Sequence, residues 1–164
     1  MSIVTPDLLR RYDVPGPRYT SYPTADRFVE AFREKDYIVA LQQRKVLSAT
    51  AVQPLSLYIH IPFCESLCYY CACNKIITKH HDRAAKYLQY LERELDLHVQ
   101  HLGRGQVVSQ LHFGGGTPTF LSDEELVSLM QVLRARFEFA PDGEYSIEVD
   151  PRTVTPERLQ VLWD

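Results

Sequence analysis

Hydrophobic and polar residues alternate most clearly in residues 55–61, LSLYIHI, where every second residue is leucine or isoleucine. This period of two predicts a β-strand with one buried face, and it places Tyr58 and His60 on the other face. Residues 82–102 instead carry leucine and valine at intervals of three and four and are followed by Gly103. This spacing predicts an amphipathic helix that ends at the glycine.

Two further strand–loop–helix units follow. Residues 107–113 (VVSQLHF) and 145–149 (YSIEV) predict the second and third strands. We expect a helix after each, and Phe137 to lie on the inner face of the first of these helices. A capping box of Ser122 and Glu125 marks the start of the first helix. Thr155 as N-cap, followed by Pro156, marks the start of the second, which runs to Asp164.

Repeated strand–loop–helix units connect parallel strands by right-handed crossovers, so we expect an α/β fold with its functional loops at the carboxyl ends of the strands. Three strands are too few to close a barrel. We therefore interpret residues 54–164 as the front half of an α/β domain that continues in a longer protein. Residues 1–53 are polar and punctuated by proline, which predicts an N-terminal extended arm with a short helix at 27–47.

Composition limits the partners of this chain. Its 164 residues carry 18 Lys and Arg against 21 Asp and Glu, a formal charge of −3, which argues against a nucleic-acid partner. No apolar run approaches the roughly 18 residues of a membrane span, and the first residues lack the apolar core of a signal peptide. We expect a cytoplasmic protein that binds no membrane.

All four cysteines lie within ten residues, in the order Cys64, Cys68, Cys71 and Cys73. Thiols this close in a reducing compartment indicate metal ligands rather than disulfides. An iron–sulfur cluster accepts thiolates from one tight loop, whereas a zinc site would need a second pair, such as His80 and His81. C-x3-C-x2-C would leave one iron of a four-iron cluster open to a ligand. The spacing leaves it undecided whether Cys73 closes the cluster.

Each of the other two strands is also followed by a chemically distinctive segment. The triplet Gly114, Gly115 and Gly116 follows the second strand, and such a loop exposes bare backbone N–H and C=O groups to a ligand; a simple tight turn is the alternative. We expect Glu148 to lie within the third strand, at the same edge of the sheet. Its carboxylate could accept both hydroxyls of a ribose, or could merely be solvated.

Taken in order, these motifs resemble those of the radical S-adenosylmethionine enzymes, and most closely the family of oxygen-independent coproporphyrinogen III oxidases. The resemblance covers nearly the whole chain, and it implies that residues 54–164 form the first half of an α/β partial barrel. The segments that carry it are PRYTSYPT (17–24), LSLYIHIPFC (55–64), C-x3-C-x2-C-x-C, LHFGGGTPT (111–119) and SIEVDPR (146–152).

The resemblance implies two kinds of cofactor and their ligands. Cys64, Cys68 and Cys71 would hold a [4Fe-4S] cluster, while Cys73 matches a fourth cysteine that is not a ligand. S-adenosylmethionine would bind the open iron. The positions that match contacts to this cofactor are Tyr58, Gly115 and Glu148, and those that match contacts to a second S-adenosylmethionine are Tyr70, Gly116 and Thr117.

The implied reaction belongs to haem biosynthesis. A 5′-deoxyadenosyl radical would abstract hydrogen from two propionate side chains of coproporphyrinogen III, which lose CO2 and become the vinyl groups of protoporphyrinogen IX. The resemblance also implies a monomer that receives electrons from a donor such as flavodoxin or ferredoxin. The residues do not indicate which side chains are catalytic.

Several other functions fit part of the pattern. A haem-chaperone branch shares the three-cysteine motif but typically lacks the fourth cysteine and the YTSYPT arm, and a haem-degrading radical methyltransferase branch is also similar. Outside enzymes, a cluster closed by Cys73 would make an electron-transfer module, and a zinc loop would make a structural binding module.

Overall fold

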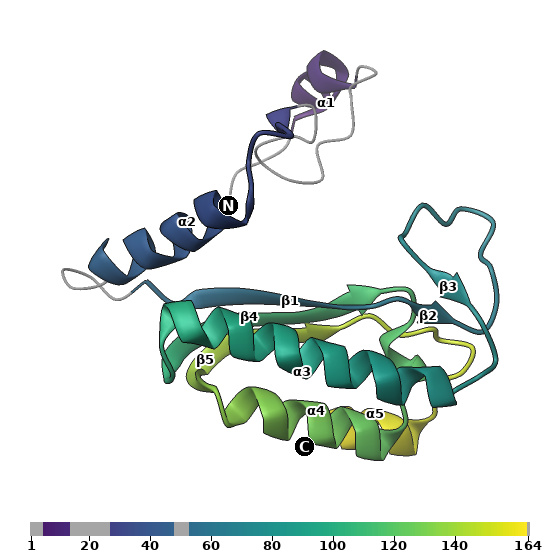
Figure 1. Cartoon of the computed structure of the whole chain (residues 1–164). Coiled ribbons are helices and arrows are strands. Elements are labelled where there is room, and N and C mark those ends of the chain that lie inside the picture. The colour runs from purple at the N-terminus through teal and green to yellow at the C-terminus, as the bar shows by residue number, and fades with distance from the viewer. Residues whose placement is uncertain (1–4, 14–26, 48–52, 164) are drawn as a thin grey trace. The chain divides into compact units, whose positions relative to one another are not determined.

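A computed structural model describes residues 5–13, 27–47 and 53–163 of the chain. Its centre is a three-stranded sheet of β1 (Leu55–Ile61), β4 (Gln106–Gly115) and β5 (Phe137–Ile147) (Figure 1). The strands lie in the order β1-β4-β5, and both pairs are parallel. The parallel α/β arrangement predicted from the repeated units is therefore confirmed.

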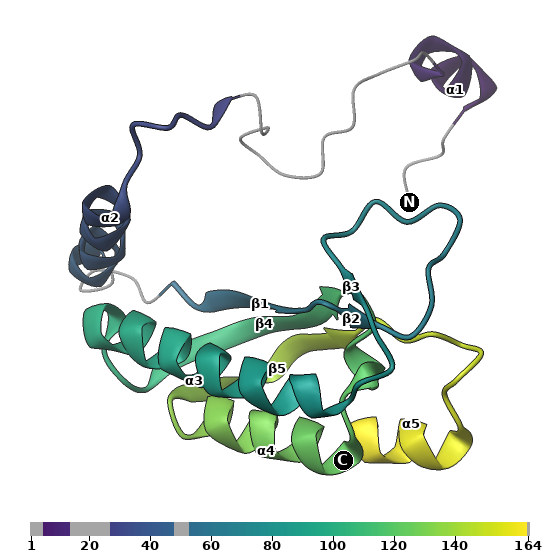
Figure 2. The same ribbon diagram turned by 45° about the vertical axis from the view of Figure 1, so that its right-hand side comes forward.

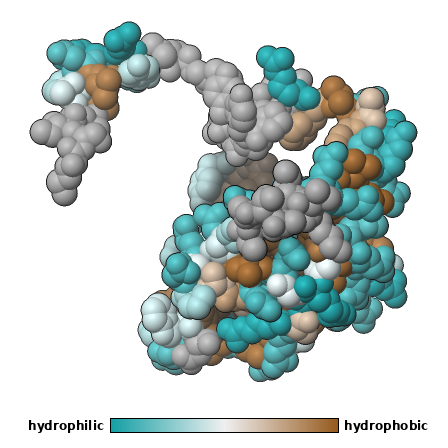
Figure 3. Space-filling model, turned by 90° about the vertical axis from the view of Figure 1, so that its left-hand side faces the viewer, coloured by the Kyte–Doolittle hydropathy of each residue, from teal (hydrophilic) through white to brown (hydrophobic). Residues whose placement is uncertain are grey.

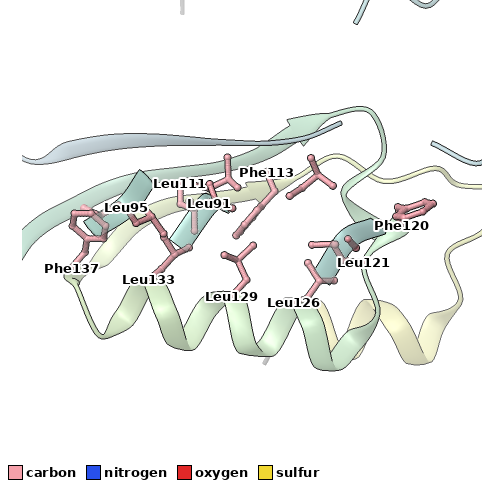
Figure 4. Packing of buried hydrophobic residues seen from close by; sticks show 14 of the residues in the cluster. Leu91, Leu95, Leu111, Phe113, Phe120, Leu121, Leu126, Leu129, Leu133 and Phe137 are labelled. Atoms are coloured by element: carbon pink, nitrogen blue, oxygen red, sulfur yellow. The ribbon is translucent and has the colours of Figure 1, made fainter. Parts of the chain in front are cut away.

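Helices α3 (Asp82–Leu102) and α4 (Asp123–Arg134) lie side by side on one face of the sheet (Figures 1 and 2). Both follow the predicted pattern: α3 ends at Gly103, which has a φ of 86°, and the complete capping box of Ser122 and Glu125 begins α4. Leucine, valine and phenylalanine side chains from these helices and from the sheet form one hydrophobic core (Figure 4). This core supports the sheet, and with it the carboxyl ends of the strands.

The last strand differs from the prediction. β5 begins at Phe137, so Phe137 is the first buried residue of a strand and not part of the helix face. Val108 pairs with Phe139 but Gln110 pairs with Glu144, so residues 140–143 bulge out of the ladder. The strand ends at Ile147, and Glu148 therefore lies directly after it rather than within it. The final helix α5 (Pro156–Trp163) starts as predicted, with the Thr155 hydroxyl accepting from the Arg158 N–H at 3.3 Å.

Two short strands that we did not predict flank the cysteine loop. β2 (Phe63–Cys64) and β3 (Ile76–Ile77) pair in parallel, so the two ends of the segment between Cys64 and Ile76 lie next to each other. A 3-10 turn, η2 (Pro118–Phe120), follows the glycine triplet. These small elements connect the two loops that carry the candidate chemistry.

The N-terminal part holds α1 (Pro6–Tyr12), which we did not predict, and α2 (Glu34–Leu47), which is shorter than the predicted 27–47. The chain divides into two compact units, one ending at Tyr37 and one starting at Ile38; the predicted boundary between residues 53 and 54 stays a prediction. The PRYTSYPT segment (17–24) and Asp164 lie outside the described residues.

The described helices include none that is long and apolar enough to cross a membrane. The face of the molecule shown in Figure 3 mixes hydrophilic residues with small hydrophobic areas, as is usual for protein surfaces exposed to water.

Candidate functional site

The sheet face opposite the helices is polar near the carboxyl ends of the strands. Side chains alternate along a strand, so the residues next to the buried Ile59 and Phe113 lie on this opposite face. The ladder places Tyr58 beside His112, and His112 beside Ser146. Three polar side chains from three strands therefore form one row across the sheet.

His60 and Tyr58 form a connected pair at this face. The Asn74 carbonyl lies 2.8 Å from His60 Nε2 and can only accept, so Nε2 carries the hydrogen. His60 Nδ1 then accepts from the Tyr58 hydroxyl at 3.1 Å. Partial burial, followed by the negative charge of Glu148, raises the pKa of Tyr58 above its ordinary value. Tyr58 is therefore a neutral hydroxyl near the glycine loop.

Glu148 faces the glycine loop. Its Oε2 accepts from the backbone N–H of Gly115 at 3.2 Å, and its Oε1 lies 3.6 Å from His112 Nε2. The Glu148 N–H donates to the Phe113 carbonyl at 2.9 Å, which continues the pairing of β4 and β5 by one residue. The Glu148 side chain keeps 55% of its surface exposed, so its carboxylate is accessible to a ligand.

The glycine loop packs its backbone against the backbone that leads into the cysteine loop. The N–H groups of Gly116 and Thr117 donate to the carbonyls of Ile61 and Phe63, each at 2.8 Å. Gly115 has a φ of 113°, in the left-handed region that favours glycine. A Cβ on Gly116 would lie 2.7 Å from the Phe63 carbonyl oxygen, so only glycine fits.

All four cysteines are free thiols, and they differ in surroundings. Cys64 is buried in β2, where its sulfur accepts from the Thr117 hydroxyl at 3.3 Å. A backbone hydrogen bond from Cys73 lowers the pKa of Cys71, whereas desolvation and then the charge of Cys71 raise the pKa of Cys73. Cys71 thus forms the thiolate, the form that ligates metal, more readily than Cys73 does.

Within the described ranges, no three His, Cys, Asp or Glu side chains are arranged around a single metal ion. This arrangement does not argue against a cluster, since a four-iron cluster takes each thiolate on a different iron and its ligands do not converge on one point. The donor set, three free thiols that are close in the sequence, with Cys64 beside the glycine loop, fits such a cluster. The ligand roles of Cys64, Cys68 and Cys71 stay a prediction.

The remaining predicted residue is Tyr70, which is not part of the row across the sheet. It lies in the cysteine loop with 90% of its surface exposed, whereas Gly116 and Thr117 are half-buried. The prediction that Tyr70, Gly116 and Thr117 contact a second S-adenosylmethionine also stays a prediction.

Our sequence analysis missed His112 and Ser146, and it considered His81 only as part of a possible zinc-ligand pair. The alternation in 107–113 could have placed His112 on the face of Tyr58. His81 stacks on Phe120 with ring centroids 4.2 Å apart, and its ring nitrogens lie 3.1 Å from the Phe120 carbonyl and 3.0 Å from Glu65. It therefore links the cysteine loop to the turn after the glycine loop.

Comparison with known proteins identifies relatives of this chain. Residues 58–164 match the family model described as the radical SAM superfamily. An oxygen-independent coproporphyrinogen III oxidase from Pseudomonas aeruginosa is 56% identical over 148 residues, which is 89% of this chain and 31% of that protein. A protein of the same name from Mannheimia haemolytica is 46% identical, over 88% of this chain and 94% of that sequence.

A solved structure of coproporphyrinogen III oxidase from Escherichia coli, which its title describes as a radical SAM enzyme, is also similar. It matches with a TM-score of 0.79 and 44% identity, over 94% of this chain and 33% of that chain. The chain thus spans about a third of the length of this structure and of most of the curated relatives it matches, with the Mannheimia haemolytica sequence as an exception. It belongs to the radical SAM superfamily and, within it, to the family of oxygen-independent coproporphyrinogen III oxidases.

Proposed function

We propose that this chain carries the cluster and the S-adenosylmethionine site for the oxygen-independent conversion of coproporphyrinogen III to protoporphyrinogen IX. One observation carries the proposal: the cysteine loop, the glycine loop and Glu148 follow three adjacent parallel strands and meet at the same sheet edge. Active sites of α/β proteins are built at this edge. A protein that used the cysteines only for structure would need neither the glycine loop nor the carboxylate beside it.

Cys64, Cys68 and Cys71 would hold the cluster, and Cys73 would remain a free thiol. The resemblance of the cysteine run to the family motif, in which the fourth cysteine is not a ligand, supports this division. When bound, the cluster and S-adenosylmethionine supply the one-electron chemistry that begins oxidation of the two propionate side chains. Cys64 is buried under the glycine loop, so the protein shields that side of the site from water and oxygen.

The chain's other residues would bind and orient S-adenosylmethionine. Glu148 has its exposed carboxylate beside the Gly115 N–H, where it can accept from both ribose hydroxyls. Tyr58 offers a neutral hydroxyl on the same face. Gly116, Thr117 and Tyr70 would hold a second S-adenosylmethionine.

We also propose the substrate class, the electron donor, the oligomeric state and the location of this chain. The substrate is a tetrapyrrole, in keeping with the names of the relatives, and a flavodoxin or ferredoxin supplies the reducing electron. The chain acts as a monomer in the cytoplasm, where a reducing environment keeps the four thiols free to ligate iron.

Anaerobic reconstitution with iron and sulfide tests the proposal. The chain should bind one four-iron cluster, and saturating S-adenosylmethionine should change the electron paramagnetic resonance spectrum of the reduced cluster. Cys68→Ala should lose the cluster, and the matched variant Cys73→Ser should retain it. Full iron and sulfide content in Cys68→Ala would refute the ligand assignment.

The spectrum separates the enzyme from an electron carrier. An unchanged spectrum under saturating S-adenosylmethionine, together with cluster loss in Cys73→Ser, would indicate a closed four-cysteine cluster. In that case the chain would carry electrons and would not activate a cofactor.

A further inference from the structure

We infer that His112 is a positioning residue, which fixes the direction of the Glu148 carboxylate and acts through it on the ribose of S-adenosylmethionine. This inference rests on the proposed function, because it takes Glu148 as the group that binds the ribose. His112 lies on β4, between the strand that carries Tyr58 and the strand that Glu148 follows.

The His112 ring is held on three sides. Its Nδ1 lies 2.8 Å from the Ser146 hydroxyl, and its ring stacks on Tyr58 with centroids 5.7 Å apart and an interplanar angle of 21°. A Cβ on Gly114 would lie 3.0 Å from His112 Nε2, so the glycine leaves just enough room for the ring. Contacts from three adjacent strands therefore set the direction of the ring.

The hydrogen-bonding groups around the His112 ring are compatible with a ring hydrogen that faces Glu148. The carboxylate can only accept, whereas the Ser146 hydroxyl can donate or accept, so both contacts are satisfied in the neutral tautomer that carries its hydrogen on Nε2. The 3.6 Å between Nε2 and Oε1 is longer than a hydrogen bond, so this contact is an electrostatic attraction. The other oxygen accepts from Gly115 N–H at 3.2 Å. The carboxylate thus has one hydrogen-bond partner and one electrostatic partner, on different oxygens.

The same two strands provide a matched control. Gln110 lies two residues before His112 on the same face and is paired with Glu144, with Nε2 and Oε2 3.4 Å apart. This pair joins the same two strands but lies farther from the glycine loop. Replacing Gln110 should therefore leave cofactor binding unchanged.

The test measures the Kd of the cluster-loaded chain for S-adenosylmethionine by anaerobic calorimetry. Glu148→Ala should raise the Kd roughly 10- to 150-fold, because a charge-assisted contact is lost. His112→Ala should raise it about 3- to 10-fold, and His112→Gln, which keeps a donor near Nε2, should restore it to within about 2-fold of wild type. Gln110→Ala should leave it unchanged.

A double-variant cycle then shows whether His112 acts through Glu148. In a Glu148→Ala background, His112→Ala should raise the Kd no further. An unchanged Kd in His112→Ala, or a full additional loss in the double variant, would overturn the inference while the ribose role of Glu148 stands. An unchanged Kd in Glu148→Ala would instead refute the ribose role itself and with it the inference.

A spectroscopic readout tests the contact without any cofactor. The imidazole nitrogen-15 signals of His112 should shift in Glu148→Gln and not in the matched variant Glu144→Gln. Signals that are identical in wild type and Glu148→Gln would overturn the inference, even if His112→Ala binds the cofactor poorly for lack of a stable fold.

Discussion

Gly116→Ala should destabilise the fold at the junction of the two loops. The added Cβ would lie 2.7 Å from the Phe63 carbonyl oxygen and 2.8 Å from both the carbonyl carbon and the carbonyl oxygen of Pro62. These are backbone atoms and cannot turn aside as a side chain would. Gly116 does not have a positive φ, so the effect is steric and not torsional. The substitution therefore has to separate the glycine loop from the backbone that leads into Cys64.

The expected loss in the free energy of unfolding follows from the contacts that must shift. Overpacking costs about 1–3 kcal/mol. Lengthening the two 2.8 Å hydrogen bonds from Gly116 and Thr117 adds up to about 1 kcal/mol each. We expect a total loss of about 2–4 kcal/mol in the free energy of unfolding, which is a large fraction of the roughly 5–15 kcal/mol that stabilises a typical domain.

Urea unfolding of the chain, followed by circular dichroism, measures this loss. Gly114→Ala is the control, because the atoms nearest its Cβ would be side-chain atoms of His112 and Tyr58, at 3.0 to 3.1 Å. These atoms need to move by only a few tenths of an ångström, so we expect a loss of about 1 kcal/mol or less. Iron content after reconstitution should fall in Gly116→Ala as well, since Cys64 directly follows Phe63. Equal stability of the two variants would refute the reasoning.

Two further substitutions test contacts around the site. Hydrogen bonds from Arg152 lower the pKa of Asp150 from 3.8 to about 2, so this pair stabilises the fold above about pH 4 and its contribution disappears as the pH falls through about 2. Asp150→Asn should therefore unfold at lower urea than wild type near neutral pH but not at about pH 2, and an equal difference at both pH values would contradict this. His81→Phe keeps the stack on Phe120 but loses the contacts with the Glu65 carboxylate and the Phe120 carbonyl, so we expect a loss of about 0.5–1.5 kcal/mol in urea unfolding and a larger loss in His81→Ala. An unchanged midpoint in His81→Phe would show that these two contacts contribute nothing.

Local patterns were enough to predict most of the elements that position the site. The spacing of apolar residues placed α3 at 82–102, and the alternation in LSLYIHI placed β1 at 55–61, each with the observed ends. In both cases one buried face repeats without interruption, so the period is visible in the sequence. The capping box and the Thr155–Pro156 start are also local signals.

The third strand was misplaced because its pattern is broken. Phe137 and Phe139 begin an alternation, but the Pro141-Asp142-Gly143 run resembles a turn. The structure accommodates residues 140–143 as a bulge, and the strand resumes at Glu144 because β4 offers pairing partners on both sides of the interruption. Only the neighbouring strand, and no local signal, shows that the two pieces form one strand.

The contacts within the site depend on registers between strands, which single residues do not reveal. The β1–β4 ladder ends with Ile61 opposite Gly115, so the cysteine loop and the glycine loop begin at the same level. The β4–β5 ladder ends with Phe113 opposite Ile147, and Glu148 comes next, within reach of the Gly115 N–H. A slip of β5 by one residue would turn Glu148 towards the core and Ile147 towards the ligand face. The sheet register therefore determines whether these three segments form one site.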